Sequence, residues 1–176
     1  MRAFSRRVIR ETVWTVMIAL LLAIIIRHFV IESFVVQGTS MEPTLQNGEH
    51  LLVNKFIYHL HPPRIGEIIV FLPPPAAHTT KDYIKRVIAV AGDTVAMRDG
   101  QVYVDGQLQH EGYLPDSYRD HADFPQEIVP RGDIFVLGDH RAVSDDSRIF
   151  GFVPIRNIRG QAVFTWWPPQ AIGTIR

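Results

Sequence analysis

The chain has 176 residues, enough for one domain with a short appendage, and its apolar fraction of 47% excludes wholesale disorder. It contains no cysteine, which excludes disulfides and thiolate zinc sites but leaves the redox compartment open. The net charge is zero, yet five arginines and one glutamate lie in residues 1–29, so the rest of the chain has an excess of four acidic residues and argues against nucleic-acid binding.

The first predicted element is an apolar run over residues 13–26, in which the single polar residue is a threonine. As a helix, its fourteen residues at about 1.5 Å each give roughly 21 Å, whereas a bilayer core is about 30 Å thick. We therefore expect a membrane span to extend into its flanks. Arg10, Glu11 and Arg27 would snorkel outward, and residues 29–31 would continue the apolar surface.

The flanks of this run indicate an uncleaved anchor. A cleavable secretory signal needs a small-x-small site just downstream, but residues 27–32 are bulky. A cleaved signal and a buried core helix are the alternatives. Four arginines precede the run and Arg27 alone closely follows it, which predicts a cytoplasmic N-terminus. We expect residues 1–31 to form the cytoplasmic N-terminus and transmembrane anchor of a cell-membrane protein, and residues 32–176 an extracytoplasmic β-rich domain.

Beyond residue 33, helical periodicity is nearly absent and turn signals abound. Asn47-Gly48, Asp99-Gly100 and Asp105-Gly106 each separate strand-like runs, as β-hairpin turns do. Strands are predicted over residues 34–37, 50–55, 68–72, 83–91, 95–98, 101–104, 107–110, 133–137 and 161–167. About nine short, closely spaced strands predict a mainly β fold, with antiparallel sheets that form a folded-over or partly open barrel.

Four further segments carry weaker signals. Residues 73–80 begin with three prolines and are predicted as a loop, and residues 111–130, which lack periodicity, as a surface excursion. His59 and His61 share a strand face without a third ligand, so no metal site is predicted. Residues 166–169, two tryptophans and two prolines, are predicted as core and strand end, with an apolar rim resting on the bilayer as the alternative.

A serine and a lysine are the candidate reactive groups. Ser40 follows Gly38 at the end of an apolar run, where a bend exposes a hydroxyl; a plain polar turn is the alternative. Lys85 lies on the strand face of Tyr83, Val87 and Ala89, where the alternative is a charged edge strand.

Burial would make that lysine a base. At the ordinary lysine pKa of about 10.4, roughly one lysine in 2,500 is neutral at pH 7. If burial lowers the pKa to about 8, roughly a tenth is neutral. A neutral amine can take the proton of a serine hydroxyl, which is the Ser–Lys form of acyl transfer.

Three stretches together resemble a known family. Residues 40–45, Ser-Met-Glu-Pro-Thr-Leu, resemble the nucleophile box of bacterial type I signal peptidases. Residues 85–86 with the later Gly-Asp at 92–93 look like the lysine box of that family. Residues 138–148, taken alone a polar loop rich in ion-pairing groups, are similar to its third box. The boxes follow in order behind an anchor, and the resemblance, to the short single-anchor form, covers nearly the whole chain.

The resemblance implies a role for each matching residue. Ser40 would be the nucleophile, Lys85 its general base, and Ser144 a hydrogen-bond partner of Lys85. Ion pairs that fix the loop would join Asp146 to Arg148 and Arg86 to Asp139. The positions that match the shallow apolar pockets for small substrate side chains are Phe34, Val36, Met41, Leu45, Tyr83 and Ile84.

The family cleaves signal peptides from exported preproteins after small-x-small sites at the outer membrane face, without metal or cofactor. The implied partners are therefore signal peptides and the lipid bilayer. Two other interpretations remain. One is a self-cleaving Ser–Lys protease like the SOS repressors, but the first 33 residues have no room for both an anchor and the helix-turn-helix of those repressors. The other is a tethered, non-catalytic β domain that binds exported chains or a partner.

The chain departs from the family at two positions. His140 stands where asparagine is usual; we expect a change in loop structure rather than a Ser-His-Asp triad, because adjacent residues such as Asp139 and His140 point in different directions. Gly38 stands where some members have a serine that helps to bind the oxyanion, which leaves the Ser40 N–H as a donor and the second donor unassigned.

Overall fold

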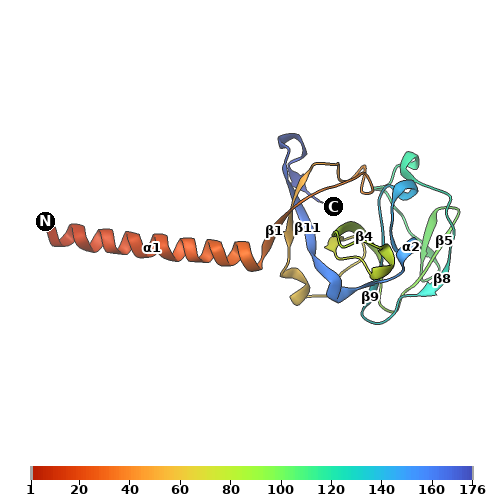
Figure 1. The fold of residues 1–176 in the computed structure, drawn as a ribbon, viewed down its shortest axis with the longest axis horizontal. Coiled ribbons are helices and arrows are strands. Elements are labelled where there is room, and N and C mark those ends of the chain that lie inside the picture. The colour runs from red at the N-terminus through yellow and green to blue at the C-terminus, as the bar shows by residue number, and fades with distance from the viewer. Residues whose placement is uncertain (1, 176) are drawn as a thin grey trace.

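A computed structural model describes the backbone of residues 2–175 and the side chains of residues 10–24 and 30–175. Helix α1 (Arg2–Phe29) projects away from a β body, as Figure 1 shows. In this described part of the chain, no helix combines the length and the hydrophobicity that a membrane span requires. The predicted anchor therefore stays a prediction. The side chains of Arg27 and Phe29, which were expected to flank it, lie outside the described residues.

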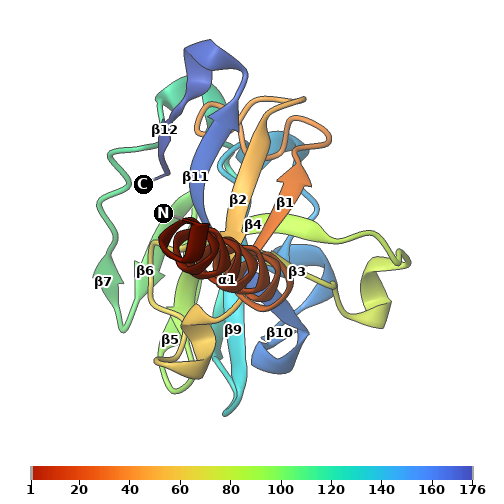
Figure 2. The same ribbon diagram turned by 90° about the vertical axis from the view of Figure 1, so that its left-hand side faces the viewer.

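The body consists of two antiparallel sheets, which confirms the mainly β prediction. In the main sheet the strand order is β1-β2-β11-β3-β4-β9-β10, with β12 paired to β11, and Figure 2 shows these strands behind α1. These strands are β1 (Ile31–Val35), β2 (His50–Asn54), β3 (Ile68–Phe71), β4 (Tyr83–Val90), β9 (Asp133–Leu137), β10 (Val153–Pro154), β11 (Ile158–Trp167) and β12 (Gly173–Thr174). The smaller sheet, in the order β7-β6-β5-β8, contains β5 (Thr94–Arg98), β6 (Gln101–Val104), β7 (Gln107–Leu108) and β8 (Phe124–Ile128).

Short helices connect the strands. The second α-helix is α2 (Ser147–Phe150), which begins just after β9 and its loop. Single-turn 3-10 helices are η1 (Ile57–His59), η2 (Pro75–Ala77), η3 (Asp116–Tyr118), η4 (Arg141–Val143), η5 (Ile155–Asn157) and η6 (Pro169–Ala171). Most connections are thus short, and the longest stretch between strands of the smaller sheet is the one between β7 and β8.

Several predicted boundaries were wrong. Strand β1 begins at Ile31, three residues before the predicted start, and β8, β10 and β12 were not predicted. Strand β8 lies inside the predicted surface excursion and at the edge of the smaller sheet, where its Pro125 is tolerated because an edge strand need not donate every N–H. The tryptophans at the end of β11 are not core: Trp166 is 40% and Trp167 49% exposed.

The core explains why β3 and β4 lie in the middle of the main sheet. All four residues of β3 are buried, and its side chains alternate between two hydrophobic clusters, Ile68 and Val70 in one and Ile69 and Phe71 in the other. Strand β4 is paired on both sides, with β3 and with β9, so its interpretation as a charged edge strand was wrong. A lysine in β4 is consequently carried into the interior of the sheet.

A glycine in β11 allows the close approach of β2. A Cβ atom at Gly160 would lie 2.4 Å from the carbonyl oxygen of Asn54, whereas one at Gly173 would meet nothing within 4 Å. We expect Gly160→Ala to destabilise the full-length protein by about 1–3 kcal/mol through overpacking. The matched control Gly173→Ala should change the free energy of unfolding by no more than about 0.5 kcal/mol. Thermal unfolding of both variants checks this, and equal midpoints would contradict it.

Candidate active site

Ser40 lies in a turn that hydrogen bonds from the neighbouring backbone N–H groups hold in place. After β1, the Val36 N–H donates to Glu49 at 2.8 Å, which closes the loop that leads into β2. Gly38 has a φ of +89°, a conformation that favours glycine, and its N–H donates to the Asn47 side chain at 2.9 Å. Ser40 is half-buried at this bend. The turn therefore presents the serine hydroxyl at the surface of the sheet rather than in a strand ladder.

The Lys85 amine donates a hydrogen bond to the Ser40 hydroxyl, with 2.7 Å between Nζ and Oγ. The lysine comes from the interior strand β4 and is only 3% exposed. Burial lowers the pKa of Lys85 to about 8, against the opposing effect of the nearby carboxylates of Asp146, Asp145 and Asp139. At neutral pH a usable fraction of this amine is uncharged, so it can act as a base toward the hydroxyl.

The predicted hydrogen bond between Ser144 and Lys85 is not formed. The Ser144 hydroxyl is buried and has no hydrogen-bond partner among the described residues. Its side chain is turned toward Gly138 instead: a Cβ at Gly138 would lie 2.2 Å from Ser144 Oγ and 2.5 Å from the carbonyl oxygen of Ser40. Gly138 is thus the residue that lets the loop from β9 pack directly on the turn that carries Ser40.

Arg86 and Asp139 form a buried, two-pronged ion pair. The distances are 2.9 Å from Arg86 Nε to Asp139 Oδ1 and 2.6 Å from Arg86 Nη2 to Asp139 Oδ2. The Thr44 hydroxyl also donates to Asp139, and Arg86 donates to the carbonyl of Gly66 at 2.9 Å. The pair therefore ties four segments together: the turn after Ser40, the loop before β3, strand β4 and the loop that follows β9.

Asp146 and Arg148 form a second pair on the other side of that loop. Arg148 donates to both carboxylate oxygens of Asp146 at 2.8 Å, and the Gly138 N–H donates to Asp146 at 3.1 Å. Asp146 is fully buried and also caps the N-terminus of α2 by accepting from the Arg148 N–H. Both predicted ion-pair contacts are therefore present in the structure.

A cleft of about 630 Å³ opens beside Ser40. Five of the six predicted substrate-binding residues line it: Phe34, Val36, Met41, Tyr83 and Ile84. The sixth, Leu45, does not; it is 1% exposed and packs in the core. Thr80, Lys81 and Asp82 also line the cleft, and nothing in the sequence pattern of their loop indicated it.

His140 acts through its backbone. Its N–H donates to the carbonyl of Ser40 at 3.0 Å, and its ring packs edge-on against Tyr118 with 4.8 Å between centroids. The neighbouring Asp139 carboxylate is engaged by Arg86 and Thr44. The local arrangement therefore agrees with a change in loop structure and gives no support to a Ser-His-Asp triad.

A serine hydroxyl that accepts a hydrogen bond from a desolvated lysine, beside a cleft with apolar and polar walls, is an arrangement that can support Ser–Lys acyl transfer. Comparison with known proteins identifies a peptidase family. The family described as "Signal peptidase, peptidase S26" matches residues 9–167. The chain therefore belongs to the signal peptidase family, peptidase S26, and is a serine endopeptidase of the signal peptidase I type.

Similar proteins cover most of the chain. It is 42% identical over 174 residues to a probable signal peptidase I-1 of Synechocystis sp., which covers 95% of this chain and 87% of that one. It is 41% identical over 168 residues to a signal peptidase I of Bacillus caldolyticus, with 88% and 90% covered. A crystal structure of a signal peptidase I from Enterococcus faecalis is 32% identical, with a TM-score of 0.49, and the match covers 57% of this chain and 97% of that one.

The two kinds of ion pair predict very different mutational costs. Asp139→Asn removes the carboxylate charge that pairs with the buried Arg86 guanidinium and should destabilise the protein by about 3–5 kcal/mol. The control Asp82→Asn removes a partly exposed pair with Arg159, at 3.3 Å, and should cost no more than about 1 kcal/mol. Denaturant unfolding of the detergent-solubilised chain measures both. Similar losses for the two variants would contradict a structural role for the buried pair.

Proposed function

We propose that the protein is a membrane-anchored endopeptidase that removes N-terminal signal peptides from exported preproteins, with Ser40 as the nucleophile and Lys85 as the general base. The single observation that carries the proposal is the 2.7 Å contact between Lys85 Nζ and Ser40 Oγ. Relatives named signal peptidase I, about 40% identical over most of the chain, support the substrate class.

The proposed reaction has two halves. Ser40 Oγ attacks the scissile carbonyl carbon while Lys85 Nζ takes the hydroxyl proton, and the resulting ammonium then protonates the leaving amine. A water molecule next attacks the acyl ester while Lys85 takes one of its protons. Lys85 then returns that proton to Ser40 Oγ as the ester bond breaks, which restores the serine hydroxyl and the neutral amine and releases the new carboxyl group. The reaction needs neither metal nor cofactor.

The oxyanion that forms in each half needs hydrogen-bond donors. The Gly38 N–H already donates to Asn47, so it is engaged elsewhere. We assign the Ser40 N–H as the donor that this turn supplies. One such donor is worth roughly 3 kcal/mol of barrier, so its geometry matters as much as that of the base.

The surrounding residues would support this chemistry without touching the substrate. Arg86 with Asp139 and Asp146 with Arg148 would fix the loop beside Lys85, through the contacts given above. Ser144 would act by packing against Gly138, which sets the distance between that loop and the turn of Ser40. Their proposed role is to hold the base and the nucleophile in place.

The cleft supports the proposed preference for small-x-small sites. Val36 and Met41 line the cleft and are almost fully buried, so little of either side chain is open to a substrate. Phe34, Tyr83 and Ile84 line the same space. An extended substrate with small side chains would fit against these walls, whereas a large side chain would meet the close-packed core beneath.

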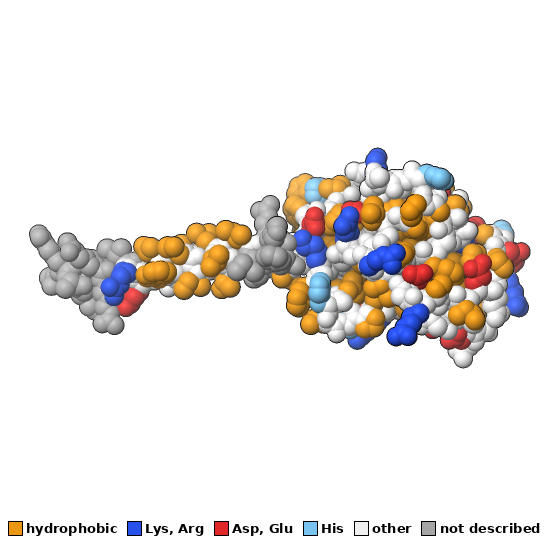
Figure 3. All heavy atoms as spheres, turned by 60° about the horizontal axis from the view of Figure 1, so that its bottom comes forward, with side chains coloured by type: hydrophobic (Ala, Val, Ile, Leu, Met, Phe, Trp, Pro, Cys, Tyr) orange, Lys and Arg blue, Asp and Glu red, His pale blue; other side chains and the backbone are white. Residues whose placement is uncertain are grey.

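We further propose that residues 1–31 anchor the enzyme in the cell membrane with the N-terminus in the cytoplasm, and that residues 32–176 are extracytoplasmic. The described apolar side chains between Val13 and Ile24 are more than half exposed, and Figure 3 shows them along α1. The half-exposed Trp166 and Trp167 lie near β1, where Trp166 donates to Ser33, and suit the bilayer interface. Enzyme and signal peptide would then meet on one membrane surface.

Ser40→Ala and Lys85→Ala test the assignment of the two reactive groups. We expect each variant to lose more than about 1,000-fold in the rate of preprotein processing, because nucleophile and base act as a unit. The controls are Ser117→Ala, an exposed serine, and Lys55→Ala, whose amine pairs with Glu32; both should process at the parent rate. The assay uses the detergent-solubilised full chain. If both test variants cleave as fast as the parent, the assignment fails.

The pH dependence follows from the lowered pKa of Lys85. Only the neutral amine accepts a proton, so kcat/KM should rise about tenfold per pH unit at low pH and level off above about pH 8. The midpoint lies below the ordinary lysine value because burial disfavours the ammonium. A rate that stays flat from about pH 5 to 9 while chemistry limits turnover would contradict a lysine base.

A further inference from the structure

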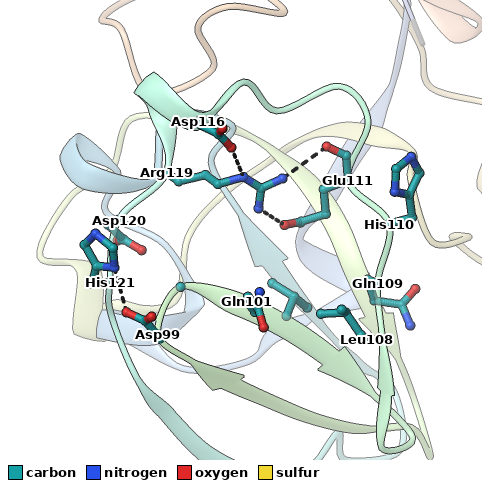
Figure 4. A pocket seen from close by; sticks show the side chains of 12 residues that line it. Asp99, Gln101, Leu108, Gln109, His110, Glu111, Asp116, Arg119, Asp120 and His121 are labelled. Atoms are coloured by element: carbon teal, nitrogen blue, oxygen red, sulfur yellow. Dashed lines mark hydrogen bonds and ion pairs between the residues drawn. The ribbon is translucent and has the colours of Figure 1, made fainter.

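One segment of the chain has no part in the chemistry described so far, yet it touches that site repeatedly. We call residues 111–121, between β7 and β8, the clamp segment. It borders a hollow of about 550 Å³ beside strand β6, shown in Figure 4. In this hollow Arg119 donates to Glu111 and to the carbonyl of Leu114, and His121 pairs with Asp99. These charged side chains of the hollow are thus paired within it.

The centre of the clamp segment is Glu111. Its side chain is only 4% exposed and lies between two arginines: Arg141 donates to both carboxylate oxygens, and Arg119 donates to one at 3.3 Å. The Tyr113 hydroxyl donates to Glu111 at 2.9 Å, and burial raises the pKa of Tyr113, which keeps that hydroxyl protonated. Removing this carboxylate would leave the guanidinium of Arg141, itself 1% exposed, without a countercharge.

Arg141 connects Glu111 to the reactive serine. Its Nε donates to the carbonyl of Gly138 at 3.1 Å. Gly138 packs directly on the carbonyl of Ser40, as its lack of room for a Cβ shows. The next contact along the loop is the His140 N–H, which donates to the same Ser40 carbonyl at 3.0 Å. Arg141 and the Gly138 backbone therefore connect Glu111 to the turn of Ser40.

Three other contacts of the clamp segment reach the same site. The Tyr118 ring packs on His140, Asp120 pairs with Arg148, and the guanidinium of Arg86 lies 3.9 Å from the centre of the Tyr113 ring. The clamp segment thus contacts Arg86 and three residues of the loop over residues 138–148. Contacts at several points hold a loop in one position better than any single pair does, because they restrict both translation and rotation.

We propose that Glu111 is a positioning residue for peptide hydrolysis: through Arg141 it holds residues 138–148 against Ser40 and keeps water away from the Lys85 amine. The inference rests on the proposed function, since it assigns Glu111 to that reaction. Glu111 does not touch the reacting atoms. Its removal is therefore expected to change the environment of the base rather than the binding of substrate.

A readout specific to this role is the pH profile. Lys85 faces Asp139, Asp145, Asp146 and Arg148 of the loop, and its Nζ lies 5.3 Å from the centre of the Tyr83 ring. If the loop moves away, water reaches the amine and its ammonium form is stabilised. The same movement takes the loop's carboxylates away, which acts in the opposite direction, but desolvation is the larger effect on the Lys85 pKa. The midpoint of the rate against pH should therefore move upward, which a mere loss of folded protein would not cause.

The experiment compares Glu111→Gln with Asp116→Asn in the full-length, detergent-solubilised chain. Asp116 lies in the same segment and pairs with Arg119 at 3.4 Å, but its side chain is fully exposed, so this pair contributes little and its variant is the matched control. For Glu111→Gln we expect kcat to fall at least about tenfold on a peptide that contains a small-x-small site, with KM within about twofold. The midpoint of the pH profile should rise by about one unit. Asp116→Asn should keep the parent kcat, KM and midpoint.

The outcomes separate this inference from the proposed function. If the parent does not cleave, or if Ser40→Ala cleaves as well as the parent, the proposed function fails. If the parent cleaves through Ser40 but Glu111→Gln keeps the parent midpoint, or raises KM alone, the role of Glu111 is overturned. Should Glu111→Gln not fold, Arg141→Lys decides, because it weakens the same connection between Glu111 and Gly138 but keeps the positive charge. An upward midpoint supports the inference, and an unchanged midpoint overturns it.

Discussion

The contact between a buried lysine amine and a serine hydroxyl is the constraint around which the rest of the structure is arranged. Strand β4 carries Lys85 into the middle of the main sheet, between β3 and β9, where water has little access. The turn after β1, the strand at one edge of the same sheet, supplies Ser40. Because burial disfavours the ammonium form, the fold itself generates the base that the proposed reaction requires.

Keeping that amine neutral conflicts with the acidic loop beside it. Asp146, Asp145 and Asp139 all favour the ammonium form of Lys85, while Arg148 opposes it. Two of the carboxylates are paired with arginines, Asp146 with Arg148 and Asp139 with Arg86, which reduces their net field at the amine. These buried pairs are costly to desolvate, so their value lies in fixing the loop and balancing its charge rather than in stability alone.

The sequence predicts this architecture well where local chemistry decides it. The hairpin turns at Asp99-Gly100 and Asp105-Gly106, and the strands around Lys85, follow from turn residues and β-branched runs. Strand β8 escaped prediction because Pro125 and its polar neighbours hide an edge strand whose pairing is set by β5. Leu45 and Ser144 were assigned to the site, yet packing directs one into the core and turns the other toward Gly138.

The sequence also contains no sign that Glu111 is buried, because its burial depends on an arginine thirty residues later in the chain.

The most direct test of the central claim is an NMR titration of the Lys85 side-chain nitrogen in the parent protein without substrate. A buried amine held against Ser40 predicts a midpoint near pH 8. A midpoint at the ordinary lysine value of about 10.4 would mean that the amine is solvated and would contradict the account.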